Sequence, residues 1–241
     1  MRSWKDSRSP WGVQLRFDDR EFEAMMDEMR HRTGSDGFTP GQGVNVELVM
    51  LKAIGVEADY VELPTGTLGR SLFDADGGVR IEVSRVISDE AEKSAIARRR
   101  LRTTLAHECG HVACHRSLFI RDTESLSLFA ESPATTMTDR RILCRSEGIG
   151  STYRGEWWEF QANRCMAALL LPRQMVGTSV RKLLAGGGFS TAIECLERGE
   201  GERLIGDLSC EYDVSQTATL YRLQGLGFIP SASQFQIQLI D

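Results

Sequence analysis

The sequence of 241 residues has little of what marks an exported or membrane-bound protein. No apolar run is long enough for a transmembrane helix, and the N-terminus carries charges but no apolar segment typical of a secretory signal. The six cysteines are scattered and form no C-x-x-C pair. Without an export signal, we expect reduced thiols in a cytoplasmic protein that makes no membrane contact.

The chain has no excess of positive charge. The net charge at pH 7 is −5, from 29 basic and 34 acidic residues. Because nucleic-acid affinity comes mainly from cations that meet phosphates, the composition gives no general reason to expect such binding. Hydrophobic residues make up 41% of the chain, which is ordinary for a globular protein that buries a core.

Histidine is rare but concentrated in one segment. Three of the four histidines lie in TTLAHECGHVACH, residues 103–115. Because residues i and i+4 share one face of a helix, His107 and His111 can present both imidazoles to one metal ion. Glu108 lies about 100° further round the helix, where it can reach a metal-bound water without ligating the metal. The spacing therefore predicts a metal site with Glu108 as its general base.

A tetrahedral metal site with one open position needs a third protein ligand. Metzincins supply a histidine six residues after the second one, but Ser117 stands there. His115 is offset by about 6 Å along the helix, which makes convergence on the same ion difficult. Glu156 and Glu159 remain. Glu159 is favoured because Asn163, one turn later, can hydrogen-bond a ligating histidine, whereas Glu156 suits the first turn of a helix.

Hydrophobic periodicity predicts an α+β fold. Three alternating stretches between residues 58 and 87 predict a small antiparallel three-stranded sheet. We expect one helix from Ser88 to about Phe119 and a second, buried helix that ends before Pro172. The expected division is a poorly ordered N-terminal arm over residues 1–18, a main domain over 19–175 and a helical C-terminal region over 176–241.

The segments TLAHECGHVACH and EFQANRCMAALLLP together resemble the ImmA/IrrE family of metallopeptidases. That family has H-E-x-x-H on one helix and E-x-x-A-N-x-x-A-x-x-L-L-x-P on the next, and the likeness covers about residues 44–175. The resemblance implies a zincin-like (gluzincin-like) core with an active-site helix pair and zinc endopeptidase activity. It also implies His107, His111 and Glu159 as ligands and Glu108 as general base. Manganese or another divalent metal also suits two histidines and a glutamate.

The resemblance further implies a protein substrate. This would be a helix-turn-helix transcriptional repressor whose cleavage relieves repression of stress-response or mobile-element genes. Tyr153 and His115 are candidates for stabilising the oxyanion, and His115 and Asn163 are candidates for supporting the ligands. The segment over residues 116–155 is long, so a cover over the substrate cleft is a further hypothesis.

The C-terminal segment IGDLSCEYDVSQTATLYRLQGLGFI resembles a helix-turn-helix, with Ser215 capping its second helix. The alternative function is therefore a DNA-binding or partner-docking regulator with a structural metal site. From Glu200 to Asp241 there are six acidic and two basic residues, which would repel phosphates. Packing or partner docking is therefore favoured over DNA binding. The basic ARRR run at residues 97–100 is expected to be a solvated helix face.

Overall fold

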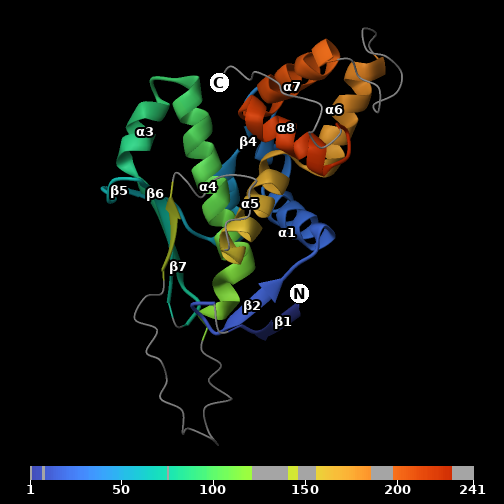
Figure 1. The fold of residues 1–241 in the computed structure, drawn as a ribbon. Helices are drawn as coiled ribbons and strands as arrows, with labels where there is room; N and C mark the ends of the chain where they lie inside the picture. Colours follow the sequence, from blue (N-terminus) through green and yellow to red (C-terminus); the bar gives the residue numbers. More distant parts are fainter. Residues whose placement is uncertain are drawn as a thin grey trace, which may run out of the picture.

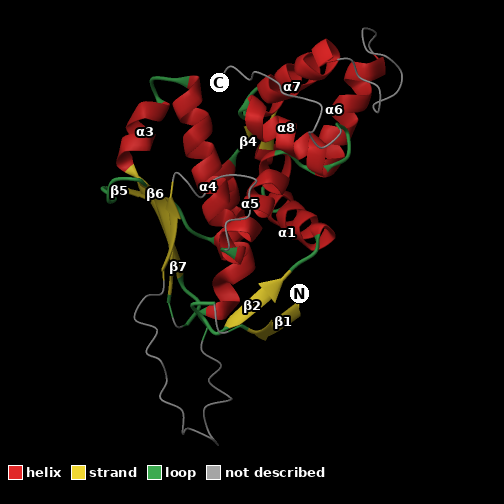
Figure 2. Ribbon diagram, viewed as in Figure 1, coloured by secondary structure: helices red, strands yellow, loops and turns green. Residues whose placement is uncertain are grey.

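The computed structural model describes residues 2–6, 9–74, 76–120, 141–145, 156–185 and 198–229. The described chain combines helices with small sheets, which agrees with the expected α+β class (Figure 2). Its elements are, in chain order, β1 (Arg2–Lys5), β2 (Val13–Arg16), α1 (Asp19–His31), η1 (Gly34–Gly37), β3 (Phe38–Thr39), β4 (Gly43–Val44), α2 (Val46–Val49), η2 (Met50–Ile54), β5 (Ala58–Val61), β6 (Thr67–Phe73), β7 (Val79–Ser84), α3 (Arg85–Ala91), α4 (Ala95–His115), η3 (Arg116–Leu118), β8 (Arg141–Arg145), α5 (Trp157–Leu170), α6 (Arg173–Ala185), α7 (Arg198–Tyr212) and α8 (Gln216–Gly225).

The long helix α4 lies at the centre of the fold (Figure 1). The largest sheet packs on one side of α4, and α5 packs along the other. Helix α1 packs against α5, and α6, α7 and α8 gather beyond the C-terminal end of α5. This arrangement explains why nearly every residue of α4 from Thr104 to His115 is buried.

The main sheet differs from the three-stranded antiparallel sheet that the alternation predicts. Its strand order is β5-β7-β6-β8, and β5 runs parallel to β7. Strands β6 and β7 form a hairpin through a turn in which Gly77 has a φ of 86°. Strand β5 therefore pairs with the other edge of β7, and β8 adds a fourth strand to β6. Alternation shows which side chains share a face of a strand but not which strand lies beside it.

The single helix expected from Ser88 to about Phe119 is two helices in the structure. Helix α3 already begins at Arg85 and ends at Ala91. The Ser94 side chain then caps α4 by accepting a hydrogen bond from the Ala97 backbone N–H. This cap satisfies an N–H group that the first turn of a helix leaves without a partner, which favours a new start over a continuous helix.

The N-terminal segment is an ordered hairpin rather than the expected poorly ordered arm. Strands β1 and β2 pair antiparallel. Leu15 on β2 is buried, and Trp11 packs edge-on against Trp157, Trp158 and Phe119 with ring centroids 5.1 to 5.8 Å apart. Burial of these apolar and aromatic side chains stabilises the hairpin against the start of α5 and the end of α4.

Helices α7 and α8 share a hydrophobic core with the rest of the described chain. Ser215 caps α8 as predicted, and its hydroxyl oxygen accepts a hydrogen bond from the Ala218 backbone N–H at 3.1 Å. Leu208 on α7 and Leu223 on α8 are fully buried in the cluster that also contains Cys109 of α4. The C-terminal helices are therefore packed against the helix that carries the histidines.

Candidate metal centre

Three side chains from α4 and α5 converge in the interior of the molecule. His107 and His111 are fully buried, and Glu159 is 8% exposed. The two Nε2 atoms lie 2.9 Å apart, Glu159 Oε2 lies 3.1 Å from His107 Nε2, and Glu159 Oε1 lies 3.3 Å from His111 Nε2. In a tetrahedral zinc site, ligand atoms are about 3.4 Å from one another. This buried group could therefore hold a metal ion.

A hydrogen bond behind each histidine decides which ring nitrogen faces this group. Behind His107, Nδ1 lies 3.0 Å from Asn163 Oδ1. Because a carbonyl oxygen can only accept, His107 donates from Nδ1 and keeps a lone pair on Nε2, the atom nearest Glu159. Asn163 therefore supports His107 in the way that the sequence predicts.

His111 is oriented by a longer chain of hydrogen bonds. Gln161 Nε2 donates to the backbone carbonyl of Leu15 at 2.6 Å, so its Oε1 accepts from His115 Nε2 at 3.1 Å. His115 then offers Nδ1 as an acceptor, and His111 donates to it from Nδ1 at 3.1 Å. His111 consequently keeps its lone pair on Nε2. His115 is thus a supporting residue, and both of its ring nitrogens are engaged, which leaves it no donor for an oxyanion.

Burial controls the protonation of these groups. Burial, reinforced by the charge of His111, lowers the pKa of His115 to about 3. Burial also lowers the pKa of His111. The charge of Glu159 acts in the opposite direction but is the smaller effect, so the pKa stays below its ordinary value. Burial alone would raise the pKa of Glu159, but whenever a proton is shared with the facing Nε2 atoms it goes to a histidine, and the resulting charge of His111 and hydrogen bonds from both rings hold the pKa of Glu159 well below its ordinary value. At neutral pH the group therefore offers a neutral imidazole and a carboxylate, the forms that bind metal.

Glu108 is fully buried and contacts the sheet that packs on α4. The Ser71 hydroxyl on β6 donates a hydrogen bond to Glu108 Oε2 at 2.5 Å. Gly69 lies two residues earlier on the same face of β6, and a Cβ there would come within 2.8 Å of Glu108 Oε1. Strand β6 therefore both holds the carboxylate and leaves room for it. Gly69 and Ser71 do not stand out in the sequence, because their role depends on how the sheet packs on α4.

A second glycine allows α4 and α5 to approach closely. A Cβ on Gly110 would lie 2.7 Å from the carbonyl oxygen of Ala162 and 2.9 Å from Cβ of Cys165. Only a hydrogen atom fits in this gap. Gly110, inside the H-E-x-x-H pattern, therefore lets α5 bring Glu159 against the histidine face of α4.

The remaining residues that could belong to the site lie in different places. Glu156 is exposed at the N-cap of α5 and makes no capping hydrogen bond, which agrees with the preference for Glu159. Tyr153 lies outside the described residues, as does most of the 116–155 segment. Gln161 was missed, because it follows Glu159 by two positions and so lies on another face of the helix.

A search of protein-family models and of curated proteins finds no match to this chain. Within the described ranges, no helix combines the length and the apolar character needed to cross a bilayer. The observations that point to a function therefore lie in the site. It is a buried group of two histidines and a glutamate that could hold a metal ion, with a second buried glutamate between the histidines in sequence.

Proposed function

We propose that the protein is a zinc-dependent endopeptidase with a zincin-like core of the ImmA/IrrE kind. The observation that carries the proposal is a buried, positioned carboxylate, Glu108, next to the paired histidines that meet Glu159. Hydrolysis needs a base near a metal-bound water, whereas a structural site is closed by four protein ligands and needs no such base. The two sequence motifs that resemble the family support the same conclusion.

The residues of this chain suggest a division of labour. His107, His111 and Glu159 would hold the ion, and manganese or iron would also fit these donors. When bound, zinc lowers the pKa of a coordinated water and polarises a carbonyl group. Glu108 would accept the proton of the attacking water and deliver it to the leaving amine. Ser71 would keep the Glu108 carboxylate in its orientation through their hydrogen bond.

The proposed substrate is a helix-turn-helix transcriptional repressor in the cytoplasm. Its cleavage would relieve repression of stress-response or mobile-element genes. The support is the family resemblance of the two motifs. Tyr153 is the remaining candidate for stabilising the oxyanion, since both ring nitrogens of His115 are engaged.

A DNA-binding regulator with a structural metal site is the second candidate, and the capped helix α8 after α7 favours it. The charges of the C-terminal segment argue against the DNA-binding regulator. Arg222, one of two basic residues between Glu200 and Asp241, is 6% exposed and pairs with Glu23 at 2.7 Å. It therefore cannot meet a phosphate. A titration with duplex DNA at low salt separates the candidates, because tight, salt-sensitive binding would favour the regulator.

The main test of the endopeptidase combines metal analysis with a cleavage assay on a repressor encoded beside the gene. We expect Glu108→Gln to keep stoichiometric zinc and to lower the cleavage rate by about 10²- to 10⁴-fold, because it removes the base but not a ligand. Glu62→Gln, a change of the same kind at an exposed position, should cleave at the wild-type rate. Full cleavage by Glu108→Gln would show that the mechanism is wrong.

The ligand assignment has a separate test. Glu159→Ala should bind zinc much more weakly, because it leaves only the two imidazoles. Competition with a chelator of known affinity measures the change. Stoichiometric zinc of unchanged affinity in this variant would exclude Glu159 as the third ligand.

A further inference from the structure

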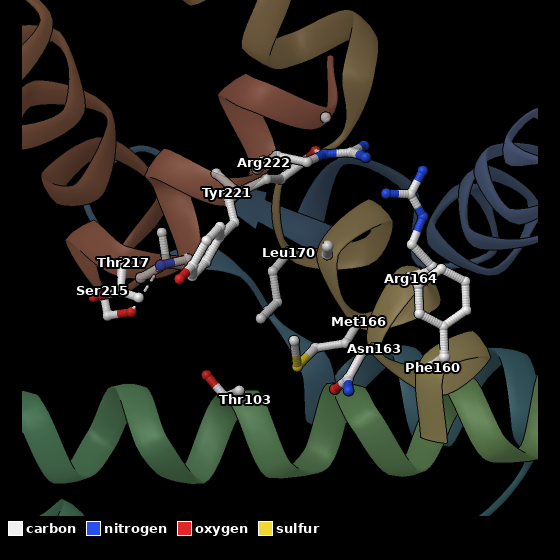
Figure 3. Close-up of a pocket in the computed structure, with 15 residues that line it drawn as sticks. Thr103, Phe160, Asn163, Arg164, Met166, Leu170, Ser215, Thr217, Tyr221 and Arg222 are labelled. Atoms are coloured by element: carbon white, nitrogen blue, oxygen red, sulfur yellow. Dashed lines mark hydrogen bonds between the residues drawn. The ribbon is translucent and has the colours of Figure 1, made fainter. Parts of the chain in front are cut away.

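A cavity of about 230 Å³ lies where α4, α5 and α8 meet (Figure 3). Thr103 of α4 forms one wall, and Met166 and Leu170 of α5 lie on a second side. Tyr221 of α8 and Ser215, the N-cap residue of that helix, also line the cavity. Engineered apolar cavities of about 150 Å³ bind benzene, so this space is large enough for a bulky side chain with some adjoining backbone.

The charged side chains of this lining are neutralised by partners elsewhere. Arg164 pairs with Asp19 at 2.5 Å, and Arg222 pairs with Glu23 at 2.7 Å. No acidic residue is among the lining residues in the described part of the chain. The cavity is therefore suited to an uncharged, apolar group, since a charged one would lose its hydration without gaining a partner.

Aromatic side chains of the lining remain open to solvent. Phe160 is 39% exposed and Tyr221 is 49% exposed. Large apolar side chains that line a cavity and stay exposed are a common feature of surfaces that bind a partner. They would gain contacts with a peptide whose side chain enters the cavity.

The cavity adjoins the candidate metal centre. Asn163 lines it and also accepts the hydrogen bond from His107 Nδ1. Thr103 precedes His107 by one helical turn, a rise of about 6 Å. Phe160, another lining residue, follows the ligand Glu159 directly. An extended peptide advances about 3.3 Å per residue, so one helical turn of α4 corresponds to about two residues of a bound peptide.

We propose that this cavity binds a bulky apolar side chain of the peptide substrate, one or two residues from the bond that is cut. The inference rests on the proposed endopeptidase function and adds a preference to it. The substrate class is a polypeptide with a leucine, methionine or phenylalanine at a fixed distance from the cut. Helix α8, which the sequence suggests as part of a DNA-binding motif, would instead form one wall of a specificity site.

The test compares where the zinc-loaded protein cuts a mixture of synthetic peptides, identified by mass spectrometry. For the wild type, we expect bulky apolar residues to be enriched at one position near the cut. Ala167→Trp and Ala218→Trp place an indole in the cavity from two different helices. Each should lower kcat/KM for such peptides by about tenfold or more relative to peptides with glycine or alanine at that position. Ala95→Trp, at the exposed start of α4, should leave the pattern unchanged.

A second measurement does not depend on cleavage. Acetyl-phenylalanine amide, added to the zinc-loaded wild type, should shift the NMR signal of the Met166 methyl group, and the shift should be lost in Ala167→Trp. If the wild type cleaves nothing but the probe still shifts Met166, the endopeptidase proposal fails while the cavity remains an apolar side-chain site. If the probe leaves Met166 unchanged, or both zinc-loaded tryptophan variants cut with the wild-type pattern, the inference is overturned.

Discussion

At the scale of single residues, amide side chains govern the ligand histidines. Asn163 accepts from His107, and Gln161 acts on His111 through His115. Each amide carbonyl can only accept a hydrogen bond. Asn163 therefore fixes the proton of His107 on Nδ1 directly, and Gln161 fixes that of His111 through His115, which leaves both Nε2 atoms free for a metal. Gln161 is itself fixed by the backbone of Leu15, so the N-terminal hairpin contributes to the geometry of the centre.

Breaking this chain of hydrogen bonds should lower the metal affinity even though every proposed ligand is still present. Gln161→Ala should weaken zinc binding by about 10- to 100-fold, because His115 loses the acceptor that fixes its tautomer and orientation. A chelator-competition titration measures the change. Gln174→Ala, on the exposed face of α6, should bind zinc as tightly as the wild type. Equal affinities in all three proteins would mean that the chain of bonds does not orient His111.

The sequence predicts the three residues that converge in the candidate metal centre better than it predicts their surroundings. His107 and His111 follow from a spacing within one helix, and Glu159 with Asn163 follows from a second helix with one-turn spacing. Ser71 and Gln161 could not be found in this way. Their contacts join elements that are far apart in the chain, and a hydroxyl or an amide at one position gives no periodic signal.

At the scale of elements, the sequence predicts the end of α5 but neither the break between α3 and α4 nor the order of the strands. Pro172 follows the end of α5 as expected, and Gly55 ends η2 in a left-handed conformation with a φ of 85°. Helix ends are local events that a cap or a glycine determines. Strand neighbours are not local, and β8 joins the sheet from a segment far beyond α4. The alternation pattern therefore could not predict the strand order β5-β7-β6-β8.

The contact between α4 and α5 predicts the effect of adding one methyl group. Gly110→Ala would place Cβ 2.7 Å from a backbone oxygen of α5, so the helices must separate. We expect the free energy of unfolding to fall by about 1–3 kcal/mol. Zinc affinity should fall as well, because Glu159 moves away from the histidines. Urea denaturation and zinc titration measure the two effects.

Gly206→Ala is a matched control on α7. A Cβ at Gly206 meets no atom within 4 Å, and alanine favours a helix over glycine. This variant should be as stable as the wild type, or more stable by about 0.5–1 kcal/mol. If both alanine variants changed stability in the same direction, propensity rather than close packing would explain the result.

At the scale of the whole molecule, one acidic residue joins the C-terminal helices to α4. Asp213 has a side chain that is 5% exposed, and it pairs with Arg98 and Arg99 at 3.0 Å and with Arg102 at 3.1 Å. The expectation that the ARRR run is a solvated face holds for Arg98 and Arg100, which are exposed, whereas Arg99 is partly buried. The pairing of Arg98 and Arg99 with Asp213 was not expected. The local sequence around the arginines gives no sign of Asp213, which lies far away along the chain.

The charge of Asp213 predicts a pH-dependent contribution to stability. Burial would raise the pKa of Asp213, but hydrogen bonds from Arg98 and Arg99 and the charge of Arg102 hold it below its ordinary value of 3.8. The stabilisation is therefore present above pH 3.8 and is lost as the pH falls through the lower pKa of the folded state. Asp213→Asn removes the charge and retains a side chain that tolerates the φ of 49° found here.

At pH 7 we expect Asp213→Asn to lower the free energy of unfolding by about 2 kcal/mol, as for other hydrogen bonds to charged groups. The difference from the wild type should shrink as the pH falls below 3.8, because the wild-type carboxylate then becomes neutral as well. Asp207→Asn, at an exposed position on α7, should stay within about 0.5 kcal/mol of the wild type. Urea denaturation of the three proteins across this pH range measures the effect. A difference that stayed constant with pH would assign the role of Asp213 to its shape rather than to its charge.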